Sequence, residues 1–267
     1  PFRARCRIIM ALIKTKTEID SMRRGGELLS RALKAAVDVS GVGVALRELD
    51  AASERVILAG GGMPSFKGYQ SHLKDTPFPS TLCISVNEEI VHGLGSRDRK
   101  FRDGDVAGLD IGCWYEGLCT DMAVTIGVGT IKPEVRKLIE VTRASLMAGV
   151  AAAHVGGTVR DISEAIEAYV KPYGYGIVRS LVGHGVGHAV HEEPHVPNYV
   201  SDRYPHVVIK EGMCLALEPM IALGGYEVET GEDGWCIVMK DRSVGAHFEV
   251  TIACTKNGAE ILTPLPV

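Results

Sequence analysis

The chain has 267 residues, of which 46% are hydrophobic, and this is enough apolar material for one sizeable core. Its formal net charge of −4 gives no globally basic surface of the kind that nucleic-acid binding requires. The longest apolar runs are far shorter than the roughly 18–20 residues that span a membrane. We therefore expect one compact domain over residues 13–267, with neither a membrane nor a specific nucleic acid as a partner.

The first twelve residues predict a short basic leader rather than a signal peptide. Arg3, Arg5 and Arg7 precede an apolar run, Ile8–Ile13, that is only six residues long and is followed by Lys14. A signal peptide needs an apolar region of about 7–15 residues and a small-residue cleavage site. We interpret residues 1–12 as a leader segment.

The cysteines indicate a reducing compartment. Seven cysteines are present, an odd number, and none of them forms a CxxC pair. Both features argue against a disulfide framework and against a cysteine zinc site. We therefore expect the chain to work in the cytoplasm.

Two pairs of helices are predicted in chain order. Apolar residues recur at helical spacing over 18–38 and over 44–58, where consecutive glycines end the second helix. Helical spacing returns over 134–153, just after Pro133, and again over 158–170. The two pairs are related by an offset of 113 residues, which places Gly43 on Gly156. This weak repeat favours two similar halves with a cleft between them, and chance similarity between amphipathic helices is the alternative.

Strand signals occupy most of the remaining chain. Alternating or continuous apolar runs mark Thr81–Val86, Asp105–Ile111, Thr120–Ile126, Met213–Ile221, Trp235–Met239 and His247–Ala253. They follow one another in hairpins rather than in βαβ units, so the predicted class is α+β.

A hairpin over 105–127 carries two aspartates within apolar strands. With a turn centred between Tyr115 and Glu116, Asp110 would directly face Asp121, about 4.5–5.5 Å away at Cβ. Two buried carboxylates at that distance require a shared proton or a cation, and carboxylates suit hard divalent ions. The alternative is a pair of ordinary strand-edge acids on a solvated face.

Four histidines lie in a glycine-rich segment over 181–195: His184, His188, His191 and His195. Such a cluster indicates metal binding or proton chemistry. The segment 191–195 also matches H-E-x-x-H, which works only on a helix, and Pro194 opposes a helix there by about 3 kcal/mol. We therefore reject the zinc-protease interpretation and expect His188 and His195 to have surface or supporting roles.

Two glutamates lie in otherwise apolar strands near the C-terminus. Glu218 stands in MCLALEP and Glu249 in AHFEV. An isolated glutamate in such a strand needs a partner, and an edge-facing acid paired with Lys or Arg is the alternative for each.

Taken together, these segments resemble the bacterial type I methionine aminopeptidases of metallopeptidase family M24, from about Ile13 onward. The matching segments are Cys83-Ile-Ser-Val-Asn-Glu-Glu-Ile-Val-His92-Gly, Asp110-Ile-Gly, Thr120-Asp121, Gly183-His184-Gly-Val-Gly187, His191-Glu-Glu-Pro194, Leu217-Glu218-Pro219 and Phe248-Glu249. Each segment alone is weak, whereas their order and spacing are highly specific. The resemblance implies the pita-bread fold, with pseudo-two-fold halves, an antiparallel sheet and outer helices.

The resemblance further implies two divalent metal ions and removal of an N-terminal methionine. Asp121 and Glu249 would bridge both ions, Asp110 would chelate one, and His184 and Glu218 would bind the other. Cobalt, manganese, iron and zinc are all compatible with this ligand set. A hydroxide bridging the ions would attack the first peptide bond.

Roles for further residues follow from the same resemblance. Glu218 would shuttle the proton, His191 would help to stabilise the oxyanion, and His92 would contact the substrate backbone and help the leaving amine. The residues at or near the methionine pocket would be Tyr69, Phe78, Cys83, His92 and Trp235. Nascent polypeptide N-termini would be the substrates of a monomer that associates transiently with ribosomes.

The sequence departs from the family pattern in four places. The stretch Gln70–Pro77 is longer than usual, and it lies between Tyr69 and Phe78. Val190 stands where bacterial members often carry Phe, His247 replaces a common Gln, and Val250 replaces a common His.

Two other functions remain open within the same fold. An Xaa-Pro aminopeptidase or dipeptidase usually carries an additional N-terminal domain, for which we expect no room in this chain. A non-catalytic pita-bread protein that binds partners is expected to lack one or more ligands, and all five are present.

Overall fold

The computed structural model describes residues 13–70 and 76–267, so the expected leader over 1–12 lies outside the described residues. The helices are α2 (Lys16–Val39), α3 (Leu46–Ala59), α4 (Pro133–Ala152), α5 (Val159–Val170) and the short η1 (Lys171–Tyr173). Each of the four predicted helices is therefore confirmed to within two residues at both ends. Within the described ranges, no helix combines the length and apolar character that crossing a membrane demands.

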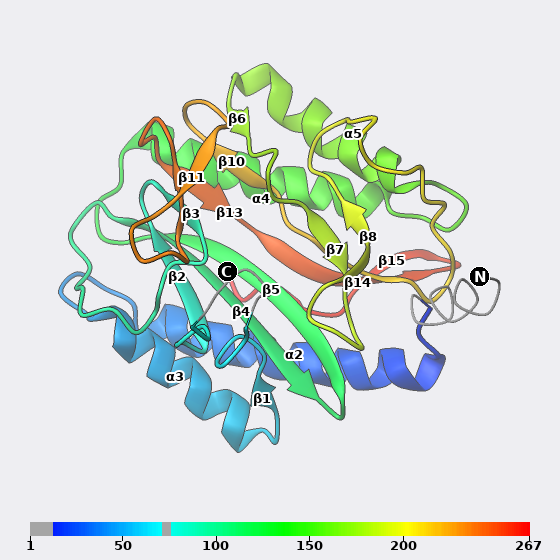
Figure 1. Ribbon diagram of the computed structural model, residues 1–267, viewed down its shortest axis with the longest axis horizontal. Helices are drawn as coiled ribbons and strands as arrows, with labels where there is room; N and C mark the ends of the chain where they lie inside the picture. The colour runs from blue at the N-terminus through cyan, green and yellow to red at the C-terminus, as the bar shows by residue number, and fades with distance from the viewer. Residues whose placement is uncertain (1–12, 71–75) are drawn as a thin grey trace.

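One large antiparallel sheet forms the centre of the molecule (Figure 1). Its main path runs through β1 (Met63–Pro64), β4 (Val106–Tyr115), β5 (Leu118–Gly127), β14 (Glu249–Thr255), β9 (Cys214–Leu217), β7 (Gly183–Gly185) and β8 (Glu192–Val196). Off this path, β2 (Leu82–Val86) pairs with β4, and β15 (Gly258–Ile261) pairs with β14. The prediction of hairpins in an α+β domain is confirmed.

Two small antiparallel sheets complete the fold. One contains β13 (Gly245–His247), β10 (Met220–Ala222) and β6 (Gly176–Ile177), and the other contains β11 (Val228–Thr230), β12 (Ile237–Met239) and β3 (Glu89–Val91). The predicted strands 213–221 and 247–253 are each split, because the chain leaves one sheet and enters another. The first split falls at Glu218 and Pro219, and proline has no N–H to continue a ladder.

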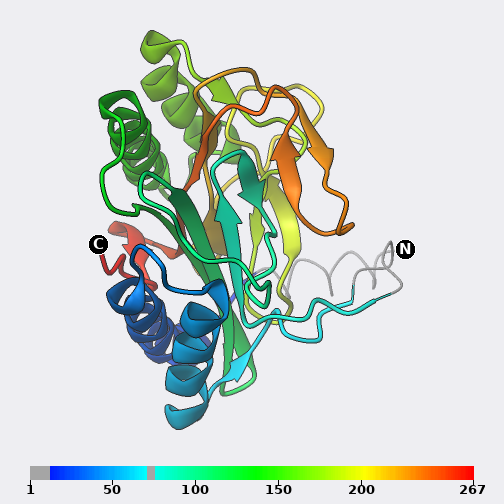
Figure 2. The same cartoon turned by 90° about the vertical axis from the view of Figure 1, so that its left-hand side faces the viewer.

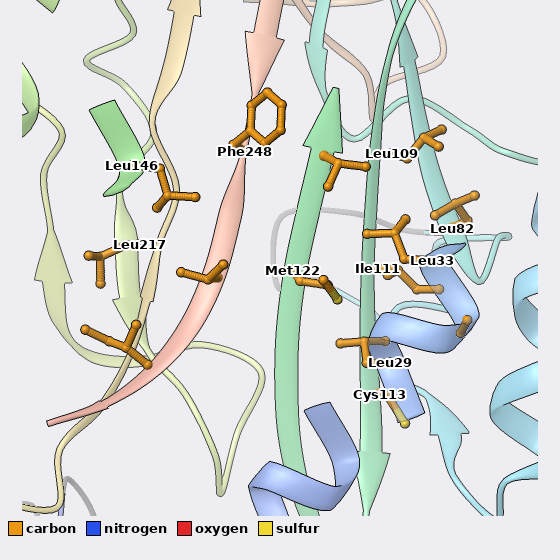
Figure 3. Close-up of a cluster of buried hydrophobic side chains, with 14 of the residues drawn as sticks. Leu29, Leu33, Leu82, Leu109, Ile111, Cys113, Met122, Leu146, Leu217 and Phe248 are labelled. Carbon is orange, nitrogen blue, oxygen red and sulfur yellow. The ribbon is translucent and has the colours of Figure 1, made fainter. Parts of the chain in front are cut away.

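The two helix pairs cover the same side of the large sheet (Figure 2). Leu109, Ile111 and Cys113 of β4 are completely buried in the main core, and Leu29 and Leu33 of α2 belong to the same cluster (Figure 3). Because successive side chains of a strand point to opposite faces, the residues between them face away from the helices. The helices therefore leave the other face of the sheet available for a site.

The hairpin between β4 and β5 turns one residue later than the sequence suggested. Glu116 and Gly117 have positive φ values of 50° and 81°, as in a two-residue type I′ turn. Asp110 consequently pairs with Ala123, so the prediction that it directly faces Asp121 is wrong. Since the pairing moves by two positions, both aspartates still share one face as diagonal neighbours.

The predicted internal repeat appears in the backbone hydrogen bonds. The N–H of Leu46, at the start of α3, donates to Arg99 O at 2.9 Å, and that of Val159, at the start of α5, donates to Val207 O at 3.0 Å. Leu46 and Val159 are 113 positions apart, which is the offset seen in the sequence. The two halves therefore anchor their second helices in the same way, as pseudo-symmetry requires.

Candidate metal centre

Neighbouring strands deliver the predicted ligands to one face of the large sheet. Asp110 on β4 and Glu249 on β14 both pair with Ala123 of β5, which lies between them. Asp121 lies two residues before Ala123 on β5, so its side chain emerges on the same face. Three carboxylates from three adjacent strands therefore converge.

The remaining two ligands come from the next two strands. His184 of β7 pairs with Ala216 of β9, and Glu218 follows two residues later, just past the end of β9. His184 Nε2 lies 3.6 Å from Glu218 Oε1. Ligand atoms of Asp121, His184 and Glu249 all lie within 4.8 Å of one another, and all three residues are buried. The structure thus brings together the residues that the sequence proposed as ligands.

Burial makes the carboxylates unfavourable as bare anions. It raises the pKa of Asp110 to about 7. It also raises the pKa values of Asp121, Glu218 and Glu249 well above their usual range, and the neighbouring carboxylates add to this effect. Repulsion and desolvation of this kind are relieved by a cation.

Two carboxylate oxygens in this cluster lack hydrogen-bond partners and are suitable as metal ligands. Within the described part of the chain, Asp110 Oδ1 and Glu249 Oε1 are buried and have no hydrogen-bond partner. A buried carboxylate oxygen without a donor is costly, and divalent cations prefer such oxygens as ligands. The donor set therefore fits the divalent metal that the sequence predicts.

Hydrogen bonds hold the His184 side chain and the backbone of Asp121 in place. His184 Nδ1 donates to Gly185 O at 2.9 Å, which leaves the Nε2 lone pair directed towards Glu218. The Thr251 hydroxyl accepts the Asp121 N–H at 2.9 Å and donates to Asp121 O at 2.8 Å. Thr251 was not predicted from the sequence, because its role depends on the pairing of β5 with β14.

His191 lies beside the ligand cluster. Its ring centroid is 4.5 Å from that of His184 in an edge-on arrangement, and its Nδ1 is 3.3 Å from Tyr69 Oη. The match to H-E-x-x-H is not helical, because residues 192–196 form β8. The structure therefore agrees with rejecting the zinc-protease interpretation.

His92 lies near the cluster from another direction. It directly follows β3 and has a φ of 60°, a left-handed conformation that it shares with only three other non-glycine residues of the described chain. β3, which His92 directly follows, packs against β13, which ends at His247. Burial lowers the pKa of His247 to about 3. His247 in turn lies beside Glu218 and Glu249, with its Nε2 3.7 and 3.9 Å from their Oε2 atoms.

The predicted methionine-pocket residues fall into three places. Tyr69 contacts His191, and Phe78 packs edge-on against Trp235 with centroids 5.2 Å apart. Cys83 of β2 is buried and pairs with Asp110 of β4. Phe78 is buried, whereas Tyr69 and Trp235 are half-buried. Residues 71–75 of the longer stretch between Tyr69 and Phe78 lie outside the described residues.

A buried ion pair behind His191 was not predicted from the sequence. The side chain of Lys14 is completely buried and binds the Glu192 carboxylate. Glu192 also accepts the backbone N–H of His188 at 2.5 Å and that of Ala189 at 2.9 Å. This contact joins residues 178 positions apart, so no local pattern could reveal it. It fixes the loop that leads into His191.

The other two histidines of the segment have contacts outside the ligand cluster. His188 Nε2 lies 2.8 Å from Glu18 Oε1, where Glu18 also caps the start of α2. His195 is exposed, with its ring 5.8 Å from that of Tyr204. Both arrangements fit the surface and supporting roles expected for these residues.

Comparison with known proteins places this geometry in a family. A model of metallopeptidase family M24 matches residues 20–256. A methionine aminopeptidase of Clostridium acetobutylicum is 42% identical over 255 residues, which cover 95% of this chain and 99% of that protein.

Solved structures agree with the sequence comparison. The crystal structure of a methionine aminopeptidase from Thermotoga maritima superposes with a TM-score of 0.89 at 38% identity, covering 94% of this chain and 98% of that one. A prolidase from Pyrococcus furiosus superposes with a TM-score of 0.76 at 25% identity, covering 97% of this chain and 67% of that one. The fold is the pita-bread fold that these proteins share. The family match and the identity to curated relatives show that this chain belongs to metallopeptidase family M24.

Proposed function

We propose that this chain is a methionine aminopeptidase that hydrolyses the first peptide bond of polypeptides beginning with methionine. The observation that carries the proposal is the convergence of Asp110, Asp121, His184, Glu218 and Glu249 on one face of the sheet. Relatives that carry this name align over nearly the whole chain, which supports the substrate class.

The ligand set is proposed to hold two divalent ions, with Asp121 and Glu249 shared between them. Four carboxylates supply more oxygen atoms than one ion needs, which supports a dinuclear site. Two bound ions would lower the pKa of a coordinated water towards neutrality and polarise the scissile carbonyl. Manganese, iron, cobalt and zinc all suit these donors.

Three residues are proposed to handle protons and the substrate. Glu218 lies at the break between β9 and β10, where its carboxylate can accept a proton and pass it to the leaving amine. His191 adjoins His184 and can donate to the oxygen on which negative charge develops. His92, which follows β3 where that strand packs against β13, can bind the substrate backbone.

The methionine side chain is proposed to bind among the aromatic residues Tyr69, Phe78 and Trp235, with Cys83 beside them. Thioether sulfur packs favourably against aromatic ring edges. The edge-on pair of Phe78 and Trp235 supports such a pocket.

The cellular setting is part of the proposal. Six cysteines within the described ranges are free and buried, which supports a reducing cytoplasm. Nascent polypeptides there would supply the N-termini, with transient ribosome contact and a monomeric enzyme.

The test compares peptide substrates with and without metal. We expect metal-stripped protein to release methionine from Met-Ala-Ser only after manganese or cobalt is added. The Asp121→Asn variant, measured in parallel, should be at least about 100-fold slower with the same ions. Selective cleavage of Xaa-Pro peptides would favour the prolidase-like alternative. Metal uptake without cleavage of either peptide class would favour a non-catalytic binding protein.

A further inference from the structure

His247 is a buried polar side chain for which the proposed chemistry has no role. It ends β13, is 2% exposed and pairs with Met220 of β10. Its backbone is held from both directions by Thr125, whose hydroxyl accepts the His247 N–H at 2.8 Å and donates to His247 O at 2.7 Å. The backbone therefore has little freedom to move the ring elsewhere.

The ring nitrogen Nε2 points at two of the proposed ligands. It lies 3.7 Å from Glu218 Oε2 and 3.9 Å from Glu249 Oε2. Among the described residues, this buried nitrogen has no hydrogen-bond partner. A buried nitrogen without a partner is unfavourable, and both carboxylates are acceptors within 4 Å of it.

The protonation of the imidazole ring decides whether His247 Nε2 can donate a hydrogen bond. A neutral imidazole carries one N–H, and Nε2 facing carboxylate oxygens is stabilised when the proton sits on that nitrogen. Carboxylates that bind a metal through one oxygen commonly receive a hydrogen bond on the other, and such donors orient the ligand. An N–H placed between Glu218 and Glu249 can orient both.

We infer that His247 is a positioning residue that donates its Nε2–H to the outer carboxylate oxygens of Glu218 and Glu249, and thereby sets the affinity of the metal centre. This inference rests on the proposed metal-dependent function and adds a residue to it. The distances of 3.7 and 3.9 Å require a small closing movement of the glutamates when the metal binds.

Two substitutions distinguish hydrogen-bond donation by His247 from the packing of its ring. His247→Gln keeps an N–H at a similar reach, whereas His247→Leu fills part of the space without a donor. His206, an exposed histidine of the loop before β9, provides the matched control His206→Leu. Metal-stripped full-length protein of each variant is titrated with Mn²⁺ by calorimetry, and its unfolding temperature is recorded first.

The inference predicts a different Mn²⁺ affinity for each variant. His247→Leu should bind Mn²⁺ about 10–100-fold more weakly than the unsubstituted protein, the usual effect of losing such a donor. His247→Gln should stay within about threefold, and His206→Leu should be unchanged. If His247→Leu does not fold, His247→Phe takes its place as the variant without a donor.

Two results would overturn the inference while leaving the proposed function intact. Full Mn²⁺ affinity in His247→Leu or its Phe replacement would make the ring a packing group only. Equal weakening in the Gln and Leu variants, with a changed visible spectrum of the Co²⁺-loaded protein, would make the ring itself a metal ligand. Failure of the unsubstituted protein to bind Mn²⁺ or Co²⁺ would instead overturn the proposed function, and this inference with it.

Discussion

At the scale of single residues, the site is a set of acidic side chains that are largely removed from water. The sequence predicted their burial, because Asp110, Asp121, Glu218 and Glu249 each interrupt an apolar strand. Asp110, Asp121 and Glu249 are buried, Glu218 is half-buried, and His184 lies close to Glu218. What the sequence could not show is how the strands that carry these groups are held together, which depends on contacts such as the hydrogen bond from the Asp121 backbone to Thr251 of a distant strand.

These acids make the metal-stripped protein sensitive to pH. Burial raises the pKa of Asp110 to about 7, while an unfolded aspartate titrates near 3.9. The folded chain then holds a proton that the unfolded chain has lost, so this stabilisation is present below about pH 4 and disappears as pH rises through about 7. Urea unfolding in chelator should therefore give a lower free energy of unfolding at pH 8 than at pH 6.

The control for this experiment is Asp110→Asn, which cannot titrate at that position. Its stability should change less between pH 6 and 8 than that of the unsubstituted protein. Stability that stays level or rises over this interval in the unsubstituted chain would show that the site does not bury its acids as described.

At the scale of elements, the strands were predicted better than their register. The apolar pattern located β4 and β5, whereas the position of the turn depends on the φ values that Glu116 and Gly117 adopt. A glycine can take a φ of 81° without strain, and other residues cannot. The turn thus decides that Asp110 pairs with Ala123.

Gly117→Ala tests the turn in isolation. A methyl group added at Gly117 would meet no atom within 4 Å, so only backbone strain can act. We expect a loss of about 1–2 kcal/mol in the free energy of unfolding. Gly41→Ala is the matched control, because its φ lies outside the positive range and its nearest neighbour is Val44 at 3.8 Å. An equal effect in both variants would contradict the type I′ turn.

Lys14 tests the link between the N-terminal segment and the histidine loop. Its side chain is 0% exposed and that of Glu192 is 10% exposed, so Lys14→Met leaves a buried carboxylate without its counter-charge. Breaking a buried pair in this way costs about 3–5 kcal/mol. Removing the exposed partner in Lys34→Met should cost less than about 1 kcal/mol. Urea denaturation of both variants measures the contrast, and equal small losses would mean that the Lys14 pair contributes little.

At the scale of the whole molecule, two pseudo-symmetric halves build one site on a shared sheet. The repeat was visible in the sequence because both halves need the same glycine turn and helix start, as at Gly43 and Gly156. The order of the strands in the sheet could not be predicted from the sequence, because β14, near the C-terminus, lies between β5 and β9. That insertion brings Glu249 next to Asp121, and it requires the complete fold.

The most direct measurement is a crystal structure of the protein soaked in Mn²⁺, with anomalous differences recorded at the manganese edge. The proposed dinuclear centre predicts two adjacent peaks enclosed by Asp110, Asp121, His184, Glu218 and Glu249, with Asp121 and Glu249 touching both. A map with no peak among these residues, or with peaks held by another set of side chains, would contradict it.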